Sequence, residues 1–322
     1  MKELRIGVVG IGHLGNYHLQ KYGKIEGCRI TAVADVIAER ALRAASQYGC
    51  PAYNDHRDLL GKVDVVSIAV PTVSHFETAI TFLEAGVHVL LEKPITVTLA
   101  EADALIAAAG RSNALLQVGF VERFNPAIIA LAKVIKQPLF IESHRLHPFF
   151  ERGTDVDVIL DLMIHDLDII LHFVKSPLKA IDAVGVSVLS DQVDIANVRL
   201  KFATGCVANI TASRVTGKTL QKIRFFGVDG YHAVDFSKRD LVSLSKRTSD
   251  AGKVEIFNNA VEVMMHDPLE AEIRSFIASV RSGATPQVTG QDGRDALELA
   301  LNISREMKKA KEDILTSMQR DL

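Results

Sequence analysis

The chain opens with a short apolar run that leads directly into a glycine-rich turn: LRIGVVGIGHLG, residues 4–15. The turn has the spacing G-x-G-x-x-G, with glycines at Gly10, Gly12 and Gly15. A buried strand is expected before the turn and a helix after it. A second predicted strand ends in Asp35, 20 residues after Gly15. This order of strand, glycine turn, helix and acidic residue is typical of a dinucleotide-binding βαβ unit.

Each part of this fingerprint has a physical role in binding a dinucleotide. The glycines allow a tight turn and a close approach of the backbone to the pyrophosphate, and the helix N-terminus supplies free N–H groups. The candidate residues of the turn are Gly10, Ile11, Gly12, His13, Leu14 and Gly15. Asp35 is expected to accept hydrogen bonds from the ribose hydroxyls, and its charge repels a 2′-phosphate, so NAD is the expected cofactor. NADP is less favoured, although Arg40 lies one helical turn further on. A glycine turn without a ligand is the alternative.

Two further predicted strands, at residues 63–70 and 87–91, end in polar or rigid residues. The second strand runs into Glu92-Lys93-Pro94, and burying such a charged pair is unfavourable unless the charges face each other, a ligand or water. Ligands bind at the carboxyl ends of strands in open parallel sheets. The expected cofactor contacts at this edge are Val70, Pro71, Thr72, His75, Glu92, Lys93 and Pro94. The alternative is an ordinary charged pair at a strand end.

The stretch from Asp155 to Phe173 is apolar nearly all round, which predicts a buried helix. It carries one polar stripe, because Asp161, His165, Asp168 and His172 occupy positions i, i+4, i+7 and i+11. A carboxylate beside a histidine orients the ring and favours its charged form, as a proton-handling pair requires. A structural Asp–His pair is one alternative. A metal site is another, but no third ligand has motif spacing, so no metal is expected.

The order of the predicted elements indicates an α/β protein with two domains. Strands alternate with helices up to residue 120, which predicts a doubly wound parallel sheet, that is, a Rossmann domain at residues 1–120. Residues 121–322 are expected to form an α+β substrate domain. Its successive strands lack crossover helices, which predicts a large, open, mostly antiparallel sheet. A sheet with one free face often pairs with a copy of itself, so a homo-oligomer, dimer or tetramer, is expected through this sheet.

Composition excludes several classes of protein. The 322 residues carry a net charge of −2 without a basic block, so no nucleic-acid partner is expected. No apolar run approaches the ~18 residues of a membrane span. The three cysteines lack CxxC spacing, and the chain starts directly with a strand rather than a signal peptide. A reduced, cytoplasmic protein is therefore expected.

Taken together, the glycine turn with Asp35, the Glu92-Lys93-Pro94 motif and the Asp161–His165 helix resemble the Gfo/Idh/MocA family over essentially the whole chain. The resemblance implies NAD-dependent hydride transfer from a sugar or cyclitol hydroxyl. Lys93, Asp161 and His165 match the motif residues of the family and are its implied catalytic residues. The chain departs from the common pattern at residues 152–157, RGTDVD, where many relatives have a glycine run.

A closer resemblance is to a branch of that family that oxidises C3 of a UDP-N-acetyl-sugar, giving the 3-keto sugar nucleotide used for lipid A. It rests on GHLG at residues 12–15, VERFNP at 121–126 and the arginine-containing segment from 145 to 158. The residues implied for the substrate are Arg123, Asn125, Arg145 and Arg152. A diphosphate favours such cationic forks, although a single arginine is more often structural. A free cyclitol or aldose as substrate and a non-catalytic dinucleotide or sugar sensor are the alternatives.

The hypothesis for the chemistry places the substrate hydroxyl between Lys93 and His165. Hydride leaves the carbon for the nicotinamide, while the hydroxyl proton goes to His165 or to Lys93. Asp161 orients His165 and stabilises its charged form. The sequence leaves the choice of proton acceptor open.

Overall fold

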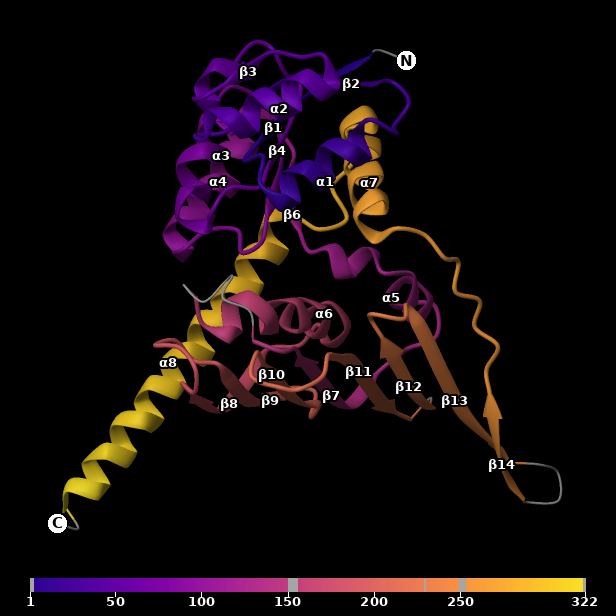
Figure 1. Ribbon diagram of the computed structural model, residues 1–322. Coiled ribbons are helices and arrows are strands. Elements are labelled where there is room, and N and C mark those ends of the chain that lie inside the picture. The colour runs from indigo at the N-terminus through magenta and orange to yellow at the C-terminus, as the bar shows by residue number, and fades with distance from the viewer. Residues whose placement is uncertain (1–2, 150–155, 229, 249–252, 321–322) are drawn as a thin grey trace. The chain divides into compact units, whose positions relative to one another are not determined.

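The structure is a computed structural model that describes residues 3–149, 156–228, 230–248 and 253–320, and the chain divides into two compact units (Figure 1). Unit 1 comprises Met1–Val121 and Asp267–Leu297, and unit 2 comprises Glu122–His266 and Glu298–Leu322. The first segment of unit 1 ends at Val121, one residue after the end of the domain expected at residues 1–120. Asp267–Leu297, however, belongs to unit 1 and not, as expected, to the second domain.

The return of the chain to unit 1 has a physical cause in helix α7, Pro268–Ser282. Its apolar side chains Ile273, Phe276 and Ile277 are buried in the core that the first strands and helix α1, His13–Tyr22, also form. Burial of these three side chains stabilises unit 1 by roughly 5–9 kcal/mol at about 1.5–3 kcal/mol each. An amphipathic pattern predicts such a helix but does not specify which core receives it.

Unit 1 contains a parallel sheet with the strand order β3-β2-β1-β4-β5-β6 across the described residues. The strands are β1 (Leu4–Val9), β2 (Cys28–Ala34), β3 (Ala52–Tyr53), β4 (Val65–Ile68), β5 (His88–Glu92) and β6 (Leu116–Gly119). The remaining helices of this unit are α2 (Ala38–Tyr48), α3 (His75–Glu84) and α4 (Leu99–Ser112), with short 3₁₀ turns at His56–Leu59 and Thr72–Ser74. This strand order is that of a doubly wound dinucleotide-binding fold, as predicted.

The central strands of this sheet are covered on both faces. Every residue of β4 is buried, and Val89, Leu90 and Leu91 of β5 are completely inaccessible. Strands that lie inside a parallel sheet read as continuous apolar runs because helices cover both sides. In β5 the polar residues His88 and Glu92 stand at the two ends of the strand, and Lys93 follows Glu92.

Unit 2 contains an eight-stranded sheet within the described segments, in the order β14-β13-β12-β11-β7-β10-β9-β8 (Figure 1). The strands are β7 (Pro138–Leu146), β8 (Leu178–Val186), β9 (Ile195–Phe202), β10 (Val207–Ser213), β11 (Leu220–Gly227), β12 (Gly230–Asp235), β13 (Asp240–Thr248) and β14 (Val254–Asn258). β7 and β10 run parallel, and the other pairs are antiparallel. The expected mostly antiparallel sheet is confirmed.

The two faces of this sheet differ. On β9, Ala196, Val198 and Leu200 are buried, whereas Asn197 and Arg199 are exposed. Helix α6, Ile164–Val174, lies across the buried face in Figure 1. The opposite face carries no helix in the part of the chain that the structure describes. This alternation gives the open sheet expected from the sequence.

The predicted helix at residues 155–173 is divided in the structure. A π-helical turn, Ile159–Met163, precedes α6, and residue 155 lies outside the described residues. A π turn is rare and frequently occurs at functional sites. Apolar periodicity reveals a buried helix here but does not reveal the widened turn, which carries Asp161.

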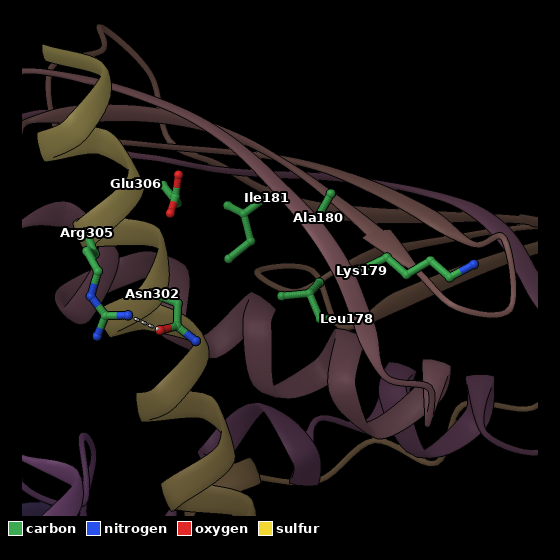
Figure 2. A pocket seen from close by; sticks show the side chains of 7 residues that line it. All are labelled: Leu178, Lys179, Ala180, Ile181, Asn302, Arg305 and Glu306. Atoms are coloured by element: carbon green, nitrogen blue, oxygen red, sulfur yellow. Dashed lines mark hydrogen bonds between the residues drawn. The ribbon is translucent and has the colours of Figure 1, made fainter. Parts of the chain in front are cut away.

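The helices that complete unit 2 are α5, Pro126–Leu131, and the part of α8, Gly290–Arg320, that follows residue 297. A shallow pocket of about 370 Å³ lies between β8 and α8 (Figure 2). Arg305 and Asn302 form a hydrogen bond of 3.0 Å at its wall. None of its lining residues is among the candidate site residues. Over the described residues, no helix is long and apolar enough to cross a membrane.

Candidate active site

The glycine turn of unit 1 is shaped so that side chains are excluded. A Cβ atom at Gly15 would lie 1.9 Å from the carbonyl oxygen of Gly10, and Gly10 itself has φ +86°. Gly12 differs, because no described atom lies within 4 Å of a Cβ placed there. It is the N-cap residue of α1, whose first N–H groups receive no side-chain cap from the described residues. The open space above this helix N-terminus fits the pyrophosphate of a dinucleotide.

Asp35 at the end of β2 holds the turn in place. Its Oδ2 accepts a hydrogen bond of 2.7 Å from the backbone N–H of Ile11, and its Oδ1 accepts one of 2.8 Å from that of Ile37. The residue is 6 % exposed. A carboxylate has about four acceptor positions, so about two stay available for ribose hydroxyls. Asp35 therefore has the geometry to shape the turn and to contact a ribose.

We expect Gly12→Ala to weaken NAD binding by at least about tenfold, or about 1.4 kcal/mol, without unfolding the protein. The added methyl group has room in the protein itself but occupies the space above the helix N-terminus. Isothermal titration calorimetry measures the affinity for NAD, and the melting temperature shows whether the protein remains folded. Gly110→Ala is the control, because Gly110 lies within α4 and also has open space at its Cβ position. Unchanged NAD affinity in Gly12→Ala would show that the pyrophosphate does not bind at this position.

Glu92, Lys93 and Pro94 follow β5, as predicted, and the Lys93–Pro94 peptide bond is cis. Glu92 Oε1 lies 3.0 Å from His18 Nε2, and Glu92 Oε2 accepts a hydrogen bond of 3.3 Å from the backbone N–H of Lys93. Burial by itself would raise the pKa of Glu92, but the hydrogen bond and charge of His18 and the charge of Lys93 outweigh it and lower the pKa. Glu92 is therefore an anion, and the partly exposed Lys93 stands beside it.

His75 joins two strand-end loops. Its Nδ1 lies 2.8 Å from the carbonyl oxygen of Pro94, and its Nε2 lies 3.0 Å from that of Val70. The ring is almost fully buried, and this burial lowers its pKa. Pro71 and Thr72 remain accessible on the same loop. His75 therefore holds the loop after β4 against the loop that carries Lys93.

In unit 2, the π turn and α6 present Asp161 and His165 as partly exposed side chains. The start of the turn is fixed by Asp157, whose Oδ1 accepts hydrogen bonds from the N–H groups of Ile159 and Leu160 at 3.1 and 3.0 Å. Its Oδ2 accepts one of 3.1 Å from Ser304 on α8. An aspartate two and three residues before backbone N–H groups is a capping signal, which was readable in the sequence.

The other half of the polar stripe, Asp168 and His172, contacts Arg123. Asp168 pairs in a bidentate manner with Arg123, at 2.7 and 2.9 Å, and Arg123 also contacts His172 Nδ1. Both Arg123 and Asp168 are nearly inaccessible. The stripe is thus divided into two partly exposed residues, Asp161 and His165, and a buried ionic cluster.

Arg145 on β7 forms a second buried cluster. It donates hydrogen bonds of 3.0 and 3.2 Å to Asp166 and one of 3.1 Å to Glu122, and it stacks over Phe236 at 4.8 Å. Burial by itself would lower its pKa, but Asp166 and Glu122 raise it above the ordinary value. The guanidinium is thereby committed to carboxylates of its own unit.

Asn125 is also a buried structural residue. Its Oδ1 caps α5 by accepting a hydrogen bond of 3.1 Å from the N–H of Ala127, and its Nδ2 donates to Glu122 and to the carbonyl oxygen of Phe236. The structure buries three of the residues expected to bind substrate, Arg123, Arg145 and Asn125, and all three form hydrogen bonds within unit 2. Arg152 lies outside the described residues. Within the described ranges, no group of three His, Cys, Asp or Glu residues is arranged to hold a metal ion.

A dinucleotide fingerprint in a parallel sheet of this order is typical of a Rossmann-fold, nicotinamide-dependent oxidoreductase, and Lys93, Asp161 and His165 are partly exposed. The sequence matches the oxidoreductase family with an NAD-binding Rossmann fold, GFO/IDH/MocA, over residues 4–120 and the GFO/IDH/MocA C-terminal domain over residues 138–232. The chain belongs to the GFO/IDH/MocA family. It is an NAD(P)-dependent dehydrogenase that acts on CH–OH groups.

Named relatives extend over nearly the whole chain. UDP-N-acetylglucosamine 3-dehydrogenase of Acidithiobacillus ferrooxidans is 38% identical over 94% of this chain and 97% of its own length. A solved structure of that enzyme superposes with a TM-score of 0.89 at 37% identity, covering 96% of this chain and 99% of its own. Myo-inositol 2-dehydrogenase of Thermotoga maritima is 29% identical over 95% of this chain and 97% of its own length. The substrate is thus a sugar or a sugar-like compound.

Proposed function

We propose that this chain oxidises the C3 hydroxyl of a UDP-N-acetyl-sugar, UDP-N-acetylglucosamine in the first place, to the 3-keto sugar nucleotide. The observation that carries the proposal is the 38% identity, over 94% of the chain, to a dehydrogenase named for this reaction. The accessible Lys93, Asp161 and His165 supply the groups that the chemistry needs.

In the proposed mechanism, Lys93 and His165 contact the hydroxyl that is oxidised. NAD⁺, when bound, accepts the hydride that leaves C3. The hydroxyl O–H bond breaks, its proton passes to His165 or to Lys93, and the C–O bond becomes a carbonyl. Asp161 orients His165 and stabilises its protonated form. Glu92 fixes the start of the turn that carries Lys93, whose side chain can hold the oxygen atom as its charge develops.

NAD is the proposed cofactor in preference to NADP. The carboxylate of Asp35 is fixed by two backbone N–H groups, so it cannot turn away from an added 2′-phosphate. Val36, which follows it, is highly exposed and offers no positive charge. A fixed anion at this position favours the ribose hydroxyls.

The buried arginines receive a different proposed role from the one that the resemblance implies. Arg123 and Arg145 hold α6 through Asp168 and Asp166, and so position the helix that carries His165. Their N–H groups are committed to these carboxylates, which reduces what they can offer a diphosphate. Arg152 remains the candidate for that contact.

The test is NADH formation with UDP-N-acetylglucosamine and, separately, with myo-inositol and glucose. A transaminase with an amine donor removes the keto product, because oxidation by NAD⁺ is uphill. We expect NADH to form with UDP-N-acetylglucosamine but not with myo-inositol or glucose. A signal with a free polyol alone would support the second candidate, a cyclitol or aldose dehydrogenase, which the similarity to the Thermotoga maritima enzyme favours. Tight NAD binding with no turnover would indicate a sensor.

A second copy of this chain is the proposed partner of the open face of the unit 2 sheet. This face carries ion pairs between Arg224 and Glu142 at 2.6 Å and between Lys201 and Asp182 at 3.1 Å, beside the exposed Val184. Charges of both signs and apolar side chains allow a face to match itself across a two-fold axis. Light scattering should give the mass of a dimer or tetramer, and Val184→Glu should lower it. A monomer mass at all protein concentrations would contradict the proposal.

A further inference from the structure

A group of buried polar side chains adjoins the Glu92–Lys93 turn inside unit 1. His18 and Tyr22 belong to α1, Gln117 to β6 and Glu272 to α7, and all four are completely inaccessible. His18 contacts Glu92, and the Nε2 of Gln117 donates a hydrogen bond of 3.4 Å to the carbonyl oxygen of Glu272. Helices α1 and α7 pack together. One core therefore joins the turn that carries Lys93 to a glutamate far along the chain.

The carboxylate of Glu92 is held from three sides. His18 Nε2 lies 3.0 Å from Oε1, and the backbone N–H of Lys93 donates to Oε2 at 3.3 Å. A Cβ atom at Gly119 on β6 would lie 3.1 Å from Oε2, so the carboxylate packs directly against a glycine backbone. The position of Glu92 therefore fixes the start of the Lys93 turn.

Glu272 is an unusual buried acid. Both of its carboxyl oxygens are buried and form no hydrogen bond within the residues that the structure describes. Burial, together with the charge of Glu92, raises its pKa well above the ordinary 4.5. A second anion in the same core as Glu92 would be strongly unfavourable. Glu272 is therefore a neutral acid, which carries an O–H that has to be donated.

Acceptors for this proton are present in the same core. Nδ1 of His18 and Oε1 of Gln117 are buried, and neither has a hydrogen-bond partner among the described residues. Nε2 of His18 contacts the Glu92 carboxylate, so Nδ1 is an acceptor only in the neutral ring, whereas Oε1 of Gln117 is an acceptor whatever the charge of that ring. Three buried polar groups in one core can be satisfied together, directly or through one buried water.

We propose that Glu272 is a positioning residue: as a neutral acid, it completes a buried network with His18 and Gln117 that keeps Glu92 as the single anion beside Lys93. The inference rests on the role proposed above for Lys93. The network acts on the reaction through Glu92, which holds the Lys93 turn. Ionisation of Glu272 would place two carboxylates around one histidine and draw His18 away from Glu92.

The first test is the pH dependence of folding. The pKa of Glu272 is higher in the folded than in the unfolded chain, so its stabilising effect is full below about pH 4.5 and is lost as pH rises towards the folded pKa. Glu272→Gln has no proton to lose, so its melting temperature should rise relative to the wild type as pH increases from about 5 to 9. The titratable groups facing the site are His18, Tyr22 and Glu92, and both proteins contain them.

The matched control is Glu270→Gln on the same helix. Glu270 is partly exposed and pairs with Arg274, so its effect on the melting temperature should be the same throughout this pH range. A flat difference for Glu272→Gln would show that Glu272 is ionised in the folded protein and would overturn the inference.

The second test is a kinetic double-mutant cycle. Glu92→Gln should lower kcat by about 10²-fold, the effect of a small misplacement of a reacting group. Glu272→Met should also lower kcat, and Glu272→Gln, which keeps a neutral donor, should recover most of the loss. In a Lys93→Ala background, all three changes should have no further effect.

The outcomes of this cycle separate two failures. If the effects of Glu92 and Glu272 multiply with that of Lys93→Ala, the network does not act through Lys93 and the inference is wrong. If Lys93→Ala alone keeps full turnover, the role proposed for Lys93 is wrong, and so is the proposal that Glu272 positions it. The pH dependence of the melting temperature would still show whether Glu272 is neutral in the folded protein.

Discussion

Replacing Lys93 or His165 by alanine is expected to lower kcat by about 10²- to 10⁴-fold, the usual contribution of a positioned acid–base group. Each side chain is partly exposed and lies on an element fixed by its surroundings. Lys93 follows Glu92, which contacts His18, and His165 lies in the first turn of α6, just after the π turn. The losses should appear in kcat, because neither variant alters the glycine turn and Asp35.

The measurement is steady-state NADH formation together with the dissociation constant of NAD. Lys24→Ala is the control, since Lys24 is an exposed lysine of unit 1 and its replacement should leave kcat unchanged. The dependence of kcat on pH in the two variants identifies the proton acceptor. It is the residue whose replacement abolishes the rise or fall of kcat that the wild type shows with pH. Near-full turnover of both alanine variants, with intact NAD binding, would eliminate the mechanism.

Arg145→Met is expected to destabilise the protein by about 3–5 kcal/mol, because it leaves a buried carboxylate without its partner. Asp166 is completely buried and receives two hydrogen bonds from Arg145, and Glu122 receives a third. Methionine has a similar size, so the lost charge and not a cavity causes the effect. The free energy of unfolding from urea titration, followed by circular dichroism, gives the magnitude.

The control is Arg29→Met. Arg29 pairs with Glu3 at 2.9 Å, and the side chains are 63% and 55% exposed, so the change should be at most about 1 kcal/mol. Arg145→Met combined with Asp166→Leu should recover part of the loss, since the completely buried charge of Asp166 is then removed together with its partner. If Arg145→Met keeps full stability and only raises the KM for the sugar nucleotide, Arg145 binds the diphosphate after all.

The parts of the fold that the sequence predicted are those with a local cause. The glycine turn, Asp35 and the strand-end lysine follow from spacing and from the edge on which parallel strands end. Strand β14 has no such signal, because all five of its residues are exposed and it lacks a buried face. The π turn also escapes periodicity, since one extra residue per turn hardly changes an apolar stretch.

The candidate site divides in the same way. Lys93, Asp161 and His165 could be located from motif and period, whereas the partners of Arg123 and Arg145 lie 45 and 21 residues away in the chain. Glu272 left a readable trace: it lies four residues before Phe276, on the apolar stripe of its helix. A charged residue on that stripe indicates a buried acid. It does not indicate which core of the protein the acid enters.

The discontinuity of unit 1 has a consequence for biosynthesis. The first 121 residues leave the ribosome without Ile273, Phe276 and Ile277, which complete their core. Until α7 emerges, the nascent cofactor-binding unit has an apolar surface that its own sequence cannot cover. Unit 2 is interrupted in the same way, because its last segment, Glu298–Leu322, is synthesised after α7, so neither unit has its full sequence until most of the chain has been made.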